Sequence, residues 1–107
     1  MRIDADGSLL CPKCGHDCTH LDDTFVAGRP REDGPFVRVH VDSHGRVAEG
    51  ASGPTPADGE GRRHHIAIAG WCEECRTRFA VVFKQHKGAT KISTVIQRWE
   101  PVPDSVI

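Results

Sequence analysis

Residues 71–85 read WCEECRTRFAVVFKQ, in which two cysteines separated by two residues run directly into an alternating strand pattern. A second pair with the same spacing stands in LLCPKCG, residues 9–15. Two intervening residues allow a tight turn that points both sulfurs at one ion, so two such pairs are typical of a tetrahedral four-thiolate site. The sequence therefore predicts one metal site, with one structural Zn²⁺ per chain, whose ligands are Cys11, Cys14, Cys72 and Cys75.

The residue that follows each pair bears on the geometry of its turn. Gly15 follows the first pair and can take a positive φ without strain. Arg76 follows the second pair, where the same conformation costs a side chain some strain. The long separation between the pairs is tolerable because loop-closure entropy grows slowly with length.

Two disulfides or four unligated thiols are the alternatives to a metal site. The first ten residues include Asp4 and Asp6 and have no apolar core, so we expect no signal peptide and a cytoplasmic location. Cysteines in that reducing compartment are more often metal ligands than disulfides.

The odd cysteine, Cys18, is expected to be a free thiol because the two pairs already complete a tetrahedron. We expect the seven histidines to be solvated or to hydrogen-bond near the ligands.

Strand patterns surround the cysteine pairs, and no stretch of useful length has a helical apolar period. The predicted fold class is therefore all-β, with an antiparallel β-meander over residues 64–99 that carries the second cysteine turn. Lys87 and Gly88 supply a hairpin turn within it. The predicted strands are residues 20–27, 36–41, 65–69, 77–85 and 91–99.

Side-chain alternation predicts which face of each strand is buried. Phe79, Val81 and Phe83 share one face of the strongest strand, and we expect that face to meet the core. Arg78 and Lys84 fall on the opposite face and are expected to point into solvent.

Residues 43–61 are rich in glycine and proline and have no periodicity. We expect a disordered loop there, inserted into a single domain of residues 1–107 that ends in a tail, residues 100–107. Only 37% of the chain is apolar, so the core is expected to be thin and to need a metal staple. No apolar run is long enough to span a membrane.

The charges are unevenly distributed, although the net charge is −1. Residues 1–61 hold six Lys and Arg against eleven Asp and Glu, whereas residues 62–98 hold eight against two. This asymmetry favours a basic face built by the second half, with a solvated sheet surface as the alternative. The candidate nucleic-acid-binding residues are Arg62, Arg63, Arg76, Arg78, Lys84, Lys87 and Lys91.

Two turns of the forms Cys-Pro-x-Cys-Gly and Trp-Cys-x-x-Cys, each leading into strands, resemble the zinc ribbon fold group. The whole chain also resembles small zinc-ribbon proteins of unknown function encoded by phages, prophages and mobile elements. The matching features are Cys11–Gly15, the polar insert 43–61, Arg62-Arg63, Trp71–Cys75 and Gln85–Gly88. The resemblance implies a zinc ribbon fold and a mobile-element origin, and it implies no activity.

Four thiolates fill the coordination shell of zinc and leave no position for a reactive water, so we expect no enzyme and no small-molecule substrate. The first hypothesis is a structural zinc module that contacts nucleic acid through the basic face of residues 62–98. The second is an adaptor that binds a host or phage protein, and the remote third is an iron electron carrier that resembles rubredoxin. Trp71 and Trp99 could stack on bases, but a tryptophan in so small a chain is more often in the core.

Overall fold

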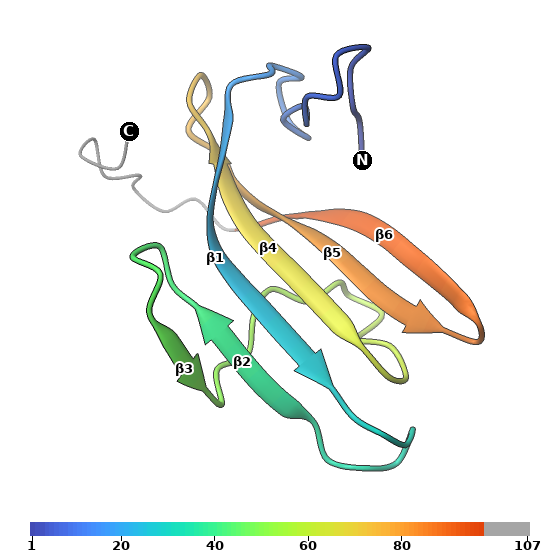
Figure 1. The fold of residues 1–107 in the computed structure, drawn as a ribbon. Helices are drawn as coiled ribbons and strands as arrows, with labels where there is room; N and C mark the ends of the chain where they lie inside the picture. Colours follow the sequence, from blue (N-terminus) through green and yellow to red (C-terminus); the bar gives the residue numbers. More distant parts are fainter. Residues whose placement is uncertain (98–107) are drawn as a thin grey trace.

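The computed structural model describes residues 1–97, which form one six-stranded antiparallel β-sheet and contain no helix (Figure 1). The predicted all-β class is therefore confirmed. Within the described residues, no helix that could cross a membrane is found. The strands are β1 (Thr19–Gly28), β2 (Val37–Val41), β3 (Val47–Glu49), β4 (His65–Cys72), β5 (Arg78–His86) and β6 (Ala89–Ile96).

The sheet consists of two three-stranded units placed edge to edge. Each unit is a meander of consecutive strands, and the pairing of β1 with β4 joins them in the order β3-β2-β1-β4-β5-β6. The meander predicted for residues 64–99 corresponds to β4, β5 and β6 as far as Ile96. Trp99 and the tail, residues 100–107, lie outside the described residues.

The first unit contains a strand that the sequence analysis does not predict. Strand β3 lies inside residues 43–61, where we expect no regular structure. It follows a turn in which the Asp42 carboxylate accepts hydrogen bonds from the backbone N–H groups of His44 and Arg46, both at 2.9 Å. An aspartate that bonds the backbone ahead of it stabilises a turn without any apolar pattern, which explains why periodicity alone missed this hairpin.

Residues 50–61, which we call the covering segment, run across one face of the sheet behind β1 and β4 (Figure 1). Gly53 packs so closely on Phe25 that a Cβ at Gly53 would lie 2.4 Å from the Phe25 Cγ. Asp58 accepts a hydrogen bond of 2.6 Å from the Lys84 Nζ. In the structure, polar and steric contacts, which periodicity does not register, hold this part of the insert 43–61 against the sheet.

A bidentate ion pair also fixes the covering segment. The two terminal nitrogens of the Arg38 guanidinium, Nη1 and Nη2, donate to the Glu60 carboxylate at 2.6 and 2.7 Å. Both side chains are mostly buried, and this pairing lowers the pKa of Glu60 although burial opposes the shift. Such fork-to-fork pairs fix orientation as well as adding energy, so the segment has a defined path over the sheet.

The two faces of the sheet are therefore unlike. The covered face lies under the covering segment, and its core is Ala67, Ala80 and Val82, against which Phe25 and Val95 pack. The opposite face, which we call the open face, exposes several aliphatic side chains of the strands, although Phe79 and Val81 on it are buried.

The expectation that Arg78 and Lys84 point into solvent is wrong. Lys84 is only 8% exposed because Asp58 and the Gly59 carbonyl lie over its ammonium group. Arg78 donates to Asp22 at 3.1 Å, and both side chains are mostly buried. Phe79 and Val81 are buried, but Phe83 is only partly buried, and the face that they share is the open face and not the covered face that holds the core.

A β-bulge in β1 supplies acids to the covered face. The register of β1 against β4 shifts between Leu21 and Thr24. The two residues within the shift are Asp22, which meets Arg78, and Asp23, which lies 3.6 Å from the His40 Nε2. A bulge changes the direction of side chains in this way, so both aspartates contact residues of the covered face.

Substitution of Gly53 tests the packing of the covering segment. Gly53→Ala is expected to destabilise the fold by about 1–3 kcal/mol, because the new Cβ must displace the root of the Phe25 side chain. Gly34→Ala is the matched control, since its Cβ would meet nothing closer than 3.4 Å. Thermal unfolding of the two variants checks this, and equal melting temperatures would contradict the packing.

Candidate metal centre

The two cysteine turns have the same backbone structure. In the first turn, the Gly15 N–H donates to the Cys11 carbonyl at 3.0 Å and the Cys11 N–H donates to the His16 carbonyl at 2.9 Å. In the second turn, the corresponding bonds join Arg76 to Cys72 at 2.9 Å and Cys72 to Thr77 at 3.0 Å. The residues between the cysteines differ, Pro-Lys in the first turn and Glu-Glu in the second. The shared backbone structure therefore indicates that both turns place their two cysteines in the same way.

The residue after each cysteine pair has the predicted conformation. Gly15 has a φ of 78° and Arg76 a φ of 62°. The left-handed conformation is free for glycine and costs an arginine some strain. The second turn therefore retains a strained residue, which the bonds around it hold in place.

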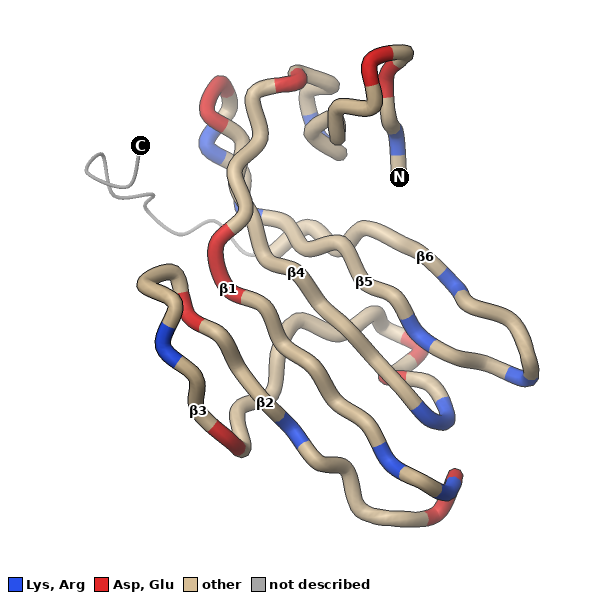
Figure 2. The backbone as a smooth tube through the Cα atoms, viewed as in Figure 1, with Lys and Arg blue, Asp and Glu red and all other residues tan. Residues whose placement is uncertain are grey.

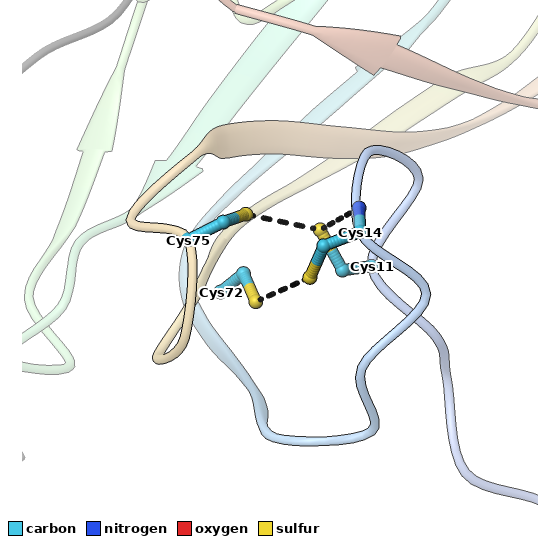
Figure 3. A group of neighbouring side chains, drawn as sticks. All are labelled: Cys11, Cys14, Cys72 and Cys75. Atoms are coloured by element: carbon cyan, nitrogen blue, oxygen red, sulfur yellow. Dashed lines mark hydrogen bonds between the residues drawn. The ribbon is translucent and has the colours of Figure 1, made fainter.

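The four sulfurs converge from both turns (Figure 3). The sulfurs of Cys11 and Cys75 are 3.6 Å apart, as are those of Cys14 and Cys72, and all four lie within 4.8 Å of one another. A disulfide requires about 2.05 Å, so these pairs are not bonded. An ion with Zn–S distances of about 2.3 Å separates tetrahedral sulfurs by about 3.8 Å, and the cluster fits that spacing. The four cysteines thus form a cluster that could hold a metal ion.

Backbone N–H groups favour the thiolate form of Cys11 and Cys72. The Cys11 sulfur faces the N–H groups of Lys13 and Cys14, at 3.4 and 3.5 Å. The Cys72 sulfur accepts the equivalent two bonds, from Glu74 and Cys75. Such bonds stabilise thiolates, which are the form that binds metals.

The thiols of the second turn differ in acidity. Burial raises the pKa of Cys72 to about 12. Burial also opposes ionisation of Cys75, but hydrogen bonds with Thr77 and with the thiols of Cys11 and Cys14 together outweigh it and lower the pKa of Cys75 to about 6. The Thr77 hydroxyl oxygen lies 3.3 Å from the Cys75 sulfur. Cys75 is therefore the sulfur that most readily offers a negative charge to a cation.

The cluster connects parts of the chain that are distant in sequence. Cys11 and Cys14 belong to the N-terminal segment, whose backbone reaches the sheet through the Thr19 hydroxyl, a donor to the Leu9 carbonyl at 3.0 Å. Cys72 is the last residue of β4, and Cys75 precedes β5. Cys11 and Cys72 are fully buried, whereas Cys14 is exposed. The cluster thus fastens the N-terminal segment to the β4–β5 turn.

Cys18 lies outside the four-sulfur cluster, as predicted. It is exposed and groups instead with His16 and Asp17. Local desolvation and the carboxylates of Asp17 and Glu73 raise the pKa of Cys18. A thiol with a raised pKa is a poor nucleophile at neutral pH.

Replacing Cys18 tests the composition of the cluster. Cys18→Ser is expected to leave the metal content and the melting temperature unchanged, because its thiol is not among the four clustered sulfurs. Metal analysis of the purified variant beside the wild type checks this. A variant with half the metal of the wild type would show that the ligand set is wrong.

The histidines near the site contact acids on the second turn. His16 lies 3.6 Å from Glu74, and His20 lies 3.5 Å from Glu73. His20 also stacks on Trp71, with ring centroids 4.5 Å apart. Trp71 is fully buried, so it belongs to the core and offers no surface for stacking on a base.

The predicted basic residues do not form one continuous patch. Arg76 and Arg78 lie at the metal end of the sheet, and Lys84 is buried against Asp58. Four others gather at the opposite end, near the start of β4 and the β5–β6 hairpin, where Figure 2 shows Lys and Arg in blue. We call this group the basic end; it consists of Arg62, Arg63, Lys87 and Lys91.

The sequence analysis missed the acids that pair with these cations. Glu32 accepts from Arg62 at 3.1 Å, Asp58 from Lys84 and Asp22 from Arg78. Two adjacent aspartates inside a predicted strand were the available signal, because charged residues seldom face a core without partners.

Comparison of the chain with protein-family models, with curated proteins and with solved structures finds no match.

Proposed function

We propose that the chain is a non-enzymatic zinc ribbon module whose four-cysteine cluster holds one structural Zn²⁺. The observation that carries this proposal is the pair of equivalent turns with four sulfurs at tetrahedral spacing. The first turn leads into β1 and the second joins β4 to β5, as the resemblance to zinc ribbons implies. Bound zinc would supply a cross-link between these elements.

The donor set argues against catalysis at this site. Four thiolates complete a tetrahedral shell, and catalytic zinc sites keep one position for water. The same donor set binds iron in proteins that resemble rubredoxin, so metal analysis decides between the two ions. One zinc per chain in a colourless protein is the expected result, and a red protein with mostly iron would favour the electron-transfer alternative.

We infer a binding role for the basic end. Lys87 lies in the tip of the β5–β6 hairpin, and Arg62 hydrogen-bonds to the backbone of β5. The hairpin and the start of β4 therefore present their cations together. Clustered Lys and Arg attract phosphates with little dependence on sequence, which makes a nucleic-acid backbone the first candidate partner.

Salt-dependent binding tests this role. Lys87→Ala/Lys91→Ala is expected to weaken binding to DNA or RNA and to reduce the salt slope by about 0.9 for each duplex DNA phosphate that the variant no longer neutralises. Lys13→Ala/Arg46→Ala is the control with the same charge change, because these residues lie away from the basic end. Absence of wild-type binding to single- and double-stranded probes at low salt would contradict a nucleic-acid role.

An adaptor for a host or phage protein is the second candidate function. The apolar side chains exposed on the open face favour it. Recovery of one protein partner whose binding withstands high salt would support the adaptor, since apolar contacts are not screened. Binding that disappears with salt would instead support the nucleic-acid role.

A further inference from the structure

Exposed aliphatic side chains gather on one face of the sheet. Seven such residues of the strands are exposed by 37–70%. The strand register places all seven on the open face and none on the covered face. They are Leu21, Val26, Val37, Val47, Ile66, Ile92 and Ile96.

The open face is nearly free of charge. Among the acidic, basic and histidine residues of the six described strands, Glu49 alone lies on it. The charged strand residues otherwise lie on the covered face, with Arg38 and Lys84 paired to the covering segment. An antiparallel sheet with one solvated face normally places apolar side chains toward the core and polar ones toward water. This sheet buries an apolar core on the covered face and also exposes aliphatic side chains on the open face, so the open face is suited to an apolar partner.

The size of the open face matches a protein interface. Six strands of three to ten residues, at about 4.8 Å spacing and about 3.4 Å rise per residue, span on the order of 700 Å². Phe79 and Val81 are already buried, so the area that the open face presents to a partner is smaller than this span. A stable complex of ordinary size buries about 800 Å² on each partner. Monomers rarely expose a continuous apolar patch beyond a few hundred Å².

We propose that the open face is the interface of a homodimer, in which the open faces of two copies pack against each other. A flat face of β-branched side chains is complementary to itself, and two such sheets pack about 10 Å apart with their side chains interdigitated. A shallow, mostly apolar depression beside β1 and β2 receives side chains of the second copy; it is lined by Val26, Gly28, Arg29, Pro30, Val37, Val39 and His64. Homodimer interfaces are more apolar than those of transient complexes, and Glu49 is the one charged strand residue on the open face among the described strands.

Measurement of molar mass in solution tests the proposal directly. The full chain is expected to have twice its monomer mass of 11.7 kDa by light scattering at micromolar concentration. Because apolar contacts are not screened, the dimer persists at high salt. A wild-type mass of one chain at concentrations up to hundreds of micromolar would overturn the proposal.

Paired substitutions locate the interface. Val26 and Ile66 lie opposite each other on β1 and β4, and Val26→Lys/Ile66→Lys is expected to raise the dimer dissociation constant at least about 100-fold by burying like charges. Ile3→Lys is the control, because Ile3 is 54% exposed but lies in the N-terminal segment outside the sheet. Metal content and circular dichroism report whether each variant folds. If the lysine pair does not fold, Val26→Thr/Ile66→Thr keeps the strand propensity and is expected to weaken the dimer in the same direction.

Deletion of residues 98–107 distinguishes the second copy from the chain's own tail. A truncated chain that remains a dimer with an unchanged dissociation constant supports the proposal. A full chain that is monomeric, together with a truncated chain that dimerises, would show that the tail covers the face and would overturn it. A lysine pair that dimerises as tightly as the wild type would also overturn it.

Discussion

Replacing Cys72 by serine is expected to abolish metal binding and to leave the chain without a cooperative thermal transition. Structural zinc contributes on the order of 10 kcal/mol to the folding of small domains, and a native domain is stable by only about 5–15 kcal/mol. Cys72 is also fully buried, so a serine hydroxyl at this position would be buried without the metal ion that the cysteine thiolate binds. Circular dichroism during heating, with metal analysis of the same sample, measures both effects.

Cys18→Ser is the matched control for this result, since it makes the same chemical change at an exposed cysteine outside the cluster. The difference between the two serine variants isolates the role of the cluster from the general effect of losing a thiol. A Cys72→Ser protein that melts cooperatively near the wild-type temperature would show that the metal is dispensable to the fold.

Replacing Trp71 by alanine is expected to be the most damaging change outside the cluster. Trp71 has no exposed surface, stacks on His20 and directly precedes Cys72. Removing a buried tryptophan costs about 3–5 kcal/mol, which lowers the melting temperature of a domain of this size by more than about 12 °C. Trp71→Phe retains a ring against His20 and is expected to lose less than half as much. Equal losses in the two variants would show that the stacking is unimportant.

The sequence was sufficient for the features that depend on local pattern. The cysteine spacing correctly grouped Cys11, Cys14, Cys72 and Cys75, because each turn is a local structure and tetrahedral geometry needs four donors. The alternation in residues 65–96 correctly predicted three neighbouring strands. The positive φ expected after each cysteine pair is also present. The identity of the ion is chemistry that sulfur spacing does not determine.

The sequence was insufficient where a long-range partner decides the outcome. The alternation of side chains placed Lys84 on the correct side of β5. That side is an interior because the covering segment lies over it, with Asp58 and Gly59 as the partners of Lys84, about 25 residues away in the sequence. The covering segment shows no apolar period because ion pairs and one glycine hold it to the sheet. Likewise, the basic residues are close in sequence and yet divide between opposite ends of the strands, because a strand of eight or nine residues carries its ends about 25 Å apart.

The separation of the two cysteine turns also imposes an order on biosynthesis. The Cys14 sulfur cannot join its neighbour in the cluster until Cys72 is synthesised, 58 residues later. Ribosomes add about 5–20 residues per second, so the first two thiols remain without their partners for about 3–12 s. During that interval β1 lacks its neighbour β4, and the first three strands expose both of their faces. A chaperone, or an ion already held by the first turn, would protect the nascent chain until the second turn leaves the ribosome.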